Sequence, residues 1–192
     1  YVKGLSATDY DNDGDLDIFV ANGHFQDIIE SLEATKTYAQ SDQLYRNNGN
    51  GTFTDISSLF PDSYFSERYV GRATVTGDYD NDGLLDLTVS NFQKETNTLY
   101  HNEGNGFFAD VTTLAGIGEI TYSYLGWGIA FFDYDNDGDL DLLVINNGDK
   151  PILYRNNGSE EVSWLEIKAV GTRSNRDAVG AIIRLRANDS DP

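Results

Sequence analysis

The chain has 192 residues, enough for one or two domains with a hydrophobic core, and a formal net charge of −19. This excess of carboxylates argues against nucleic acid or an anionic membrane as a partner, because both would be repelled. It lacks cysteine and methionine and has no apolar run that approaches the ~18 residues of a membrane-spanning helix.

The first predicted strand leads into an acidic nine-residue loop, DYDNDGDLD, from Asp9 to Asp17. The loop recurs as DYDNDGLLD from Asp78 to Asp86 and as DYDNDGDLD from Asp133 to Asp141. Four or five carboxylates in so short a segment repel one another unless a cation lies among them. Oxygen ligands at alternate positions suit a hard cation, and calcium best of all. We therefore expect about three calcium ions, one in each loop, with a structural role.

Positions 1, 3, 5 and 9 of each loop offer carboxylates, and position 7 is expected to offer its backbone carbonyl, because its side chain varies between copies. Glycine at position 6 permits the sharp turn. The candidate metal ligands are Asp9, Asp11, Asp13, Asp15 and Asp17 in the first loop, Asp78, Asp80, Asp82, Leu84 and Asp86 in the second, and Asp133, Asp135, Asp137, Asp139 and Asp141 in the third.

Three other interpretations of the loops are open to the same residues. An EF-hand requires a bidentate glutamate at position 12, where this chain has Val20, Val89 and Val144. Magnesium favours a compact octahedron that keeps several waters, so it fits less well. The remaining alternative is an aspartate-rich turn that is satisfied by its own backbone amides and holds no metal.

Each loop is followed by a second motif, Leu-Tyr-Arg/His-Asn, which begins at Leu44, Leu99 and Leu153 and leads into an Asn-Gly type turn. Segments rich in β-forming residues flank each loop, as at 127–132 and 140–145. Four short antiparallel strands in each repeat predict the blade of a β-propeller. We thus expect an all-β fold, a partial propeller of about three four-stranded blades at 1–57, 70–112 and 126–158, followed by a short β segment at 159–192.

The first repeat carries an insertion between its second and third strands, roughly Gly23 to Gln40. Within it Phe25, Ile28, Ile29 and Leu32 fall at helical spacing, which predicts a short amphipathic helix. The antiparallel order places this insertion on the face opposite the acidic loops. Aromatic interblade segments are expected on the same face, where their rings either pack between blades or contact a partner. They are Phe60, Tyr64, Phe65 and Tyr69, then Tyr122, Tyr124 and Trp127.

The loops and the motifs that follow them resemble the FG-GAP/VCBS repeat family, whose calcium-loop blades also occur in integrin α-subunits. That resemblance covers about 2–158 and implies ligand binding on the face away from calcium. The tail, with Trp164 to Ile167 and Ser174 to Ala181, is similar to the start of an ASPIC/UnbV domain. The pairing of the two is typical of the cartilage acidic protein family and its bacterial relatives.

Two classes of function remain at this point. The favoured hypothesis is a non-catalytic, secreted or cell-surface module (periplasmic or outer-surface in a bacterium) that uses structural calcium and binds a protein or glycan. The alternative is a set of supporting blades in a carbohydrate-active lyase or hydrolase. No motif with catalytic mechanics is present, and both histidines, His24 and His101, are expected to be ordinary loop or strand residues. Three blades do not close a ring, so further blades are expected in the full protein.

Overall fold

A computed structural model describes residues 1–58, 65, 67–158, 167–173, 175–178, 181 and 183. The chain divides into two compact units, Tyr1–Val162 and Ser163–Pro192. In the second unit the backbone N–H of Gly171 donates to the carbonyl of Arg176. Half of the tail motif and most of the β segment expected at 159–192 lie outside the described residues. No helix in the described ranges is long and apolar enough to cross a membrane.

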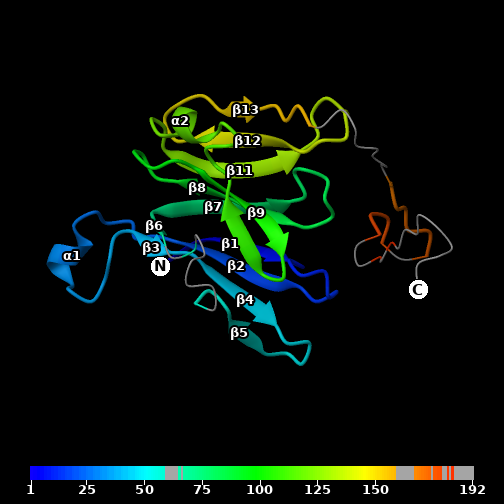
Figure 1. The fold of residues 1–192 in the computed structure, drawn as a ribbon, viewed down its shortest axis with the longest axis horizontal. Coiled ribbons are helices and arrows are strands. Elements are labelled where there is room, and N and C mark those ends of the chain that lie inside the picture. The colour runs from blue at the N-terminus through cyan, green and yellow to red at the C-terminus, as the bar shows by residue number, and fades with distance from the viewer. Residues whose placement is uncertain are drawn as a thin grey trace. The chain divides into compact units, whose positions relative to one another are not determined.

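The first unit is built of consecutive antiparallel sheets, as predicted (Figure 1). The first sheet has the order β1-β2-β4-β5, with bounds Val2–Thr8, Asp17–Asn22, Gln43–Asn47 and Phe53–Asp55. The second has the order β10-β9-β8-β7, with β7 Gly71–Gly77, β8 Asp86–Asn91, β9 Thr98–Gly104 and β10 Phe107–Asp110. The third comprises β11 Gly126–Phe132, β12 Asp141–Asn146 and β13 Ile152–Tyr154. This arrangement is a partial, β-propeller-like, all-β fold.

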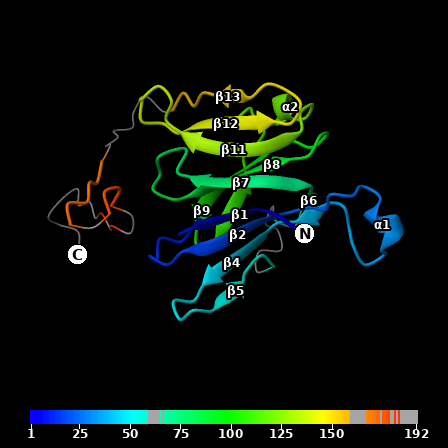
Figure 2. The same ribbon diagram turned by 180° about the vertical axis from the view of Figure 1, so that it is seen from behind.

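The three acidic loops connect the first and second strands of each sheet and gather at one end of the first unit (Figures 1 and 2). The N-terminus and helix α1, Ile29–Leu32, lie at the opposite end. The second strands, β2 and β8, are buried along nearly their whole length. β8 lies in the middle sheet, which packs against the first sheet on one face and the third on the other. Burial on both faces does not make β8 an apolar run, because Thr88, Ser90 and Asn91 are buried along with Leu87 and Val89.

Two apolar cores lie between successive sheets. The first includes the buried rings of Phe19, Phe65, Tyr100 and Phe108, and the second centres on Leu142 and its neighbours in the second and third sheets. The first strands approach one another closely, so that a Cβ added at Gly4 on β1 would lie 2.9 Å from the backbone nitrogen of Thr74 on β7. Glycine is needed at this position because the two backbones leave no room for a side chain.

Each first strand contains a register shift at the same place. The pairing jumps from Val2 to Gly4 on β1, from Gly71 to Ala73 on β7 and from Gly126 to Gly128 on β11. The residues passed over, Lys3, Arg72 and Trp127, each stand six positions before an acidic loop. A bulge of this kind bends the strand and redirects its extra side chain.

The insertion differs from its prediction. Only a single helical turn forms at α1, and of the four apolar residues at helical spacing only Ile29 is buried. Phe25, Ile28 and Leu32 are exposed. The end of the insertion instead forms strand β3, Gln40–Ser41, which pairs with β6, Arg68–Tyr69. A second helical turn, α2, spans Gly118–Thr121.

The interblade aromatic residues fall into two groups. Phe65 is buried and packs between the first two sheets, and Tyr69 is half-buried. Tyr122 and Trp127 are exposed, with Tyr124 between these extremes. Phe60 and Tyr64 lie outside the described residues. The packing interpretation therefore applies to Phe65, whereas Trp127 is free to meet a ligand.

Candidate metal centres

The aspartates at positions 1 and 5 shape each loop by accepting hydrogen bonds from its backbone. In the second loop the N–H of Gly83 donates to Asp78 Oδ2 at 2.9 Å, and that of Leu84 donates to Asp82 Oδ1 at 2.8 Å. Equivalent bonds form in the first and third loops. The turn requires a left-handed asparagine at position 4, with φ of 58°, 61° and 59° at Asn12, Asn81 and Asn136. The fold of the loop is thus encoded within the loop itself.

The aspartate at position 9 joins the loop to the third strand of its sheet. Asp17, Asp86 and Asp141 are each fully buried. One carboxylate oxygen of Asp86 accepts the N–H of Tyr79 in the loop at 3.1 Å, and the other accepts the N–H of Asn102 on β9 at 2.8 Å. The same pair of bonds is found in the first and third repeats. Two charge-assisted bonds to backbone amides make this residue a structural anchor as well as a candidate ligand.

The loops bring candidate ligand atoms within 4.8 Å of one another. The clusters are Asp9, Asp11 and Asp13 in the first loop, Asp78, Asp80 and Asp82 in the second, and Asp133, Asp135 and Asp141 in the third. A further cluster joins Asp80 and Asp86 to His101. Positions 1, 3 and 5 therefore come together in two loops, and positions 1, 3 and 9 in the third. Position 7 supplies no carboxylate to these clusters.

Several oxygens in these clusters have no hydrogen-bond partner. Asp9 Oδ1 and Asp11 Oδ1 in the first loop, and Asp135 Oδ1 in the third, are shielded from solvent and unpaired. A shielded carboxylate oxygen without a partner is costly, and two of them in one loop repel each other. An all-oxygen donor set of this kind fits Ca²⁺, which would supply the missing partner and neutralise the charge.

The electrostatics of the loops reflect the same crowding. Burial is the main cause that raises the pKa of Asp86 to about 6, partly offset by the backbone hydrogen bonds from Asn102 and Tyr79. Burial also raises the pKa of Asp17 and Asp80. The pKa of Asp137 is lowered instead, chiefly by the hydrogen bond from the N–H of Asp139. A divalent cation within such clusters would favour the ionised carboxylates.

In the second and third repeats, a basic side chain from the Leu-Tyr-Arg/His-Asn motif reaches the acidic loop of the same repeat. Arg155 Nε lies 3.0 Å from Asp135 Oδ2, and its Nη2 lies 3.4 Å from Asp137 Oδ2. In the second repeat His101 Nδ1 lies 3.1 Å from Asp86 Oδ1 and 3.3 Å from Asp80 Oδ2. His101 is therefore part of the acidic cluster rather than an ordinary strand residue. The sequence held a signal for this, because the third residue of each Leu-Tyr-Arg/His-Asn motif is basic.

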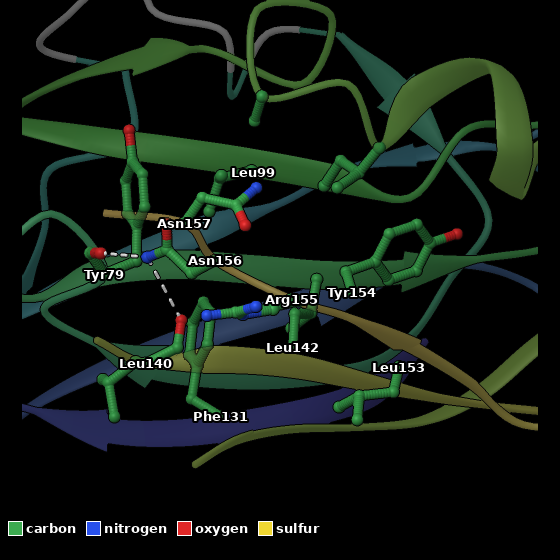
Figure 3. Close-up of a pocket in the computed structure, with 12 residues that line it drawn as sticks. Tyr79, Leu99, Phe131, Leu140, Leu142, Leu153, Tyr154, Arg155, Asn156 and Asn157 are labelled. Carbon is green, nitrogen blue, oxygen red and sulfur yellow. Dashed lines mark hydrogen bonds between the residues drawn. The ribbon is translucent and has the colours of Figure 1, made fainter. Parts of the chain in front are cut away.

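Asparagine side chains link consecutive repeats at this end of the molecule. Asn156 donates from Nδ2 to the carbonyl of Tyr79 in the preceding loop at 2.6 Å and to the carbonyl of Leu140 at 3.3 Å (Figure 3). Asn12 donates to the carbonyl of Gly83 at 2.9 Å, and Asn81 donates to Asp139 Oδ1 at 2.8 Å. The three loops thus form a hydrogen-bonded series. Sequence reasoning missed these links, because they depend on how repeats are placed beside one another.

An apolar pocket of about 420 Å³ lies beside Asn156, against the third sheet (Figure 3). Leucine side chains such as Leu99 and Leu142 line it, together with Phe131 and Tyr154. Its lining contains no carboxylate and no histidine. The corresponding packing between the first two sheets includes the rings of Phe65 and Phe108. The pocket is therefore a space beside β13 that is lined by leucines, aromatic rings and the polar side chains of Arg155, Asn156 and Asn157.

With this geometry in hand, the comparisons with known proteins identify the repeats. The family model described as "FG-GAP-like repeat" matches residues 9–89 and 78–144, which together make up most of the chain. The chain belongs to the FG-GAP-like repeat family. Both matches begin at an acidic loop, the feature that the three sheets share. The FG-GAP repeats here follow one another with the loops on a common end.

One curated relative is similar to this FG-GAP chain. Cartilage acidic protein 1 of Mus musculus is 24% identical over 144 residues, which are 75% of this chain and 21% of the relative. The chain thus spans about a fifth of the length of that protein. The similarity agrees with the assignment of the chain to the FG-GAP-like repeat family.

Proposed function

We propose that the three FG-GAP loops bind calcium and that each ion rigidifies the loop of its own repeat. The observation that carries this proposal is the set of shielded, unpaired carboxylate oxygens, Asp9 Oδ1, Asp11 Oδ1 and Asp135 Oδ1, inside clusters of oxygen donors. The proposed ligands are the carboxylates at positions 1, 3, 5 and 9 and the carbonyls of Asp15, Leu84 and Asp139 at position 7. Calcium would neutralise each cluster and fix the turn that begins the second strand of each sheet.

Calorimetric titration of chelator-stripped protein with calcium tests this proposal directly. About three ions are expected to bind, and the melting temperature should rise with calcium concentration, because an ion that binds only the folded state stabilises it. Magnesium in the same titration serves as the control for simple charge screening. Absence of binding together with an unchanged melting temperature would overturn the calcium assignment in all three loops.

A single-site variant sharpens the test. Asp11→Asn removes one unpaired oxygen from the first loop and should remove or weaken one of the three sites while the other two remain. Asp55→Asn, on the exposed strand β5 outside the clusters, removes the same charge and should leave the number of ions unchanged. Equal effects of the two variants would indicate that calcium responds to overall charge alone.

At the level of the whole molecule, we propose a non-catalytic, secreted or cell-surface FG-GAP module that binds a protein or glycan on the face opposite the loops. The exposed aromatic residues on that face, Trp127 and Phe25 among them, support this proposal. Similarity to a cartilage protein supports an extracellular location. The alternative, supporting blades of a lyase or hydrolase, is less well supported, since the pocket beside Asn156 has no carboxylate and no histidine in its lining.

A further inference from the structure

The three bulge residues lie side by side at the end of the first unit opposite the loops. Lys3, Arg72 and Trp127 occupy the same position on β1, β7 and β11, and they line one pocket of about 530 Å³. A bulge redirects its extra side chain, and three bulges at one level direct three side chains to one place. The repeat geometry therefore builds a shared site from one residue of each sheet.

Aromatic rings position the two cations in this pocket. The Lys3 ammonium lies 5.3 Å from the centroid of the Phe25 ring, and the Arg72 guanidinium lies 4.6 Å from that of Phe92. The Phe25 ring is itself fixed by stacking on buried His24, with centroids 4.8 Å apart. Cation–π contacts hold both charges in place. Arg72 also donates from Nη1 to the carbonyl of Gly71 at 3.2 Å, which leaves its other guanidinium donors for a ligand.

Among the described residues, ion pairs do not neutralise these two cations, although the charge of Glu95 acts on Arg72. Within the part of the chain that the structure describes, neither Lys3 nor Arg72 makes an ion pair with a carboxylate. Burial lowers the pKa of Lys3 and so, to a lesser extent, does the positive charge of Arg72. Burial lowers the pKa of Arg72 as well, against the opposing influence of Tyr38 and Glu95. In a chain of net charge −19, two adjacent unpaired cations mark the place that favours an anion.

Trp127 supplies the third element of the site. Its side chain is 57% exposed, so a face of the indole is available to a ligand. A flat, apolar ring beside two cations matches a sugar that carries an acidic group, because the C–H face of a pyranose packs on an aromatic ring. We propose that this pocket binds an acidic carbohydrate, with a sugar ring against Trp127 and its carboxylate between Lys3 and Arg72.

This proposal names the ligand class and the residues of the binding module proposed above. It rests on that proposed function only in placing the ligand on the face opposite the acidic loops. An acidic peptide would also meet the two cations, but it gives no reason for an exposed indole at the third equivalent position. Arginine can grip a carboxylate with two parallel hydrogen bonds, which gives the pocket geometric as well as electrostatic selectivity.

Titration of the calcium-loaded protein with trigalacturonic acid, followed by NMR of the Trp127 indole N–H and by calorimetry, tests the proposal. The methyl-esterified trimer is the matched neutral ligand, and poly-glutamate is the matched acidic peptide. The acid trimer should shift the Trp127 signal and bind at least about tenfold more tightly than either comparison ligand, the change expected for one charge-assisted bond.

Variants separate the pocket from general charge. Arg72→Gln and Trp127→Ala should each weaken binding of the acid trimer by about tenfold or more. Lys150→Gln removes an exposed charge that does not line the pocket and should leave binding unchanged. Equal binding of poly-glutamate, or equal loss in all three variants, would show attraction to charge alone and overturn the proposal. Failure of the trimer to bind while calcium still stabilises the protein would overturn this inference and leave the calcium proposal standing.

Discussion

Asn102 donates a hydrogen bond from Nδ2 to the backbone carbonyl of Tyr10 at 2.8 Å, although 92 residues separate them. Asn102 is fully buried, and its partner lies in the acidic loop of the preceding repeat. Asn156 makes the corresponding bond to Tyr79. The asparagine of each Leu-Tyr-Arg/His-Asn motif in the second and third repeats therefore fastens its sheet to the loop before it.

Asn47 offers a matched control for the contribution of this link. Asn47 and Asn102 make the same two bonds within their own repeats. Each side-chain Nδ2 donates to the carbonyl of the residue before the position-9 aspartate, and each Oδ1 accepts the N–H of the glycine two residues further on. We expect Asn102→Ala to lower the free energy of unfolding by about 1–3 kcal/mol more than Asn47→Ala, since it leaves the carbonyl of Tyr10 unpaired. Urea denaturation at saturating calcium measures both. Equal losses would mean that the link between repeats contributes nothing.

Adjacent aspartates of the first loop should differ sharply in their effect on calcium. Asp13 belongs to a cluster of possible ligands, whereas Asp15 at position 7 does not, and the second repeat has Leu84 there. Asp15→Leu should keep three calcium ions, and Asp13→Asn should weaken the first site by about tenfold or more. Both variants remove one negative charge, so calorimetry compares them directly. Loss of a site in Asp15→Leu would place the side chain, rather than the carbonyl, in the ligand set.

The series of loop contacts can be cut at Asn81. Its Nδ2 donates to Asp139 Oδ1, and glycine tolerates its φ of 61°. Asn81→Gly should lower stability by about 1 kcal/mol through loss of a bond to a charged group. Asn136 has a φ of 59° and makes no such bond to another loop among the described residues, so Asn136→Gly controls for backbone entropy. Thermal melting measures the stability of both variants. Similar shifts in the melting temperature of the two would exclude a role for the loop contact.

Asp42 predicts a pH dependence away from the loops. It is almost fully buried, it accepts the N–H of Asn22 at 3.0 Å, and burial raises its pKa to about 7. The native state thus holds a proton that the unfolded chain releases near pH 4, so the contribution of Asp42 to stability should fall as pH rises from about 4 to about 7.

The second repeat shows how to remove this dependence. Asn97 accepts the corresponding bond from the N–H of Asn91 at 2.9 Å. Asp42→Asn should therefore keep the bond and raise stability at pH 8 by about 1–3 kcal/mol relative to the parent, with little change near pH 4. Chemical denaturation across this range measures it, and a parallel loss of stability at both pH values would show that Asp42 is ionised in the native protein.

The sequence predicted what is local to each repeat. Strand boundaries around Asp133–Asp141 and the turns at the acidic loops follow from residue pattern and glycine placement, and the structure confirms them. The short helix predicted around Phe25 to Leu32 forms only as the single turn α1, because spacing alone does not show that Phe25 packs on His24 instead of facing a core. The links from Asn102 and Asn156, and the meeting of Lys3 with Arg72, were not foreseen. They depend on the position of one sheet against the next, which no single repeat encodes.

The buried aspartate at position 9 also bears on the order in which the repeats form. Its bond to the third strand closes a segment of 30 residues in the first repeat, from Asp17 to Asn47, but only 16 and 15 residues in the second and third. Closing the longer segment costs roughly 0.6 kcal/mol more chain entropy. The second and third repeats therefore close shorter segments and are expected to fold sooner. In hydrogen-exchange experiments during folding, the backbone amides of the first repeat, which carries the insertion, are expected to become protected last.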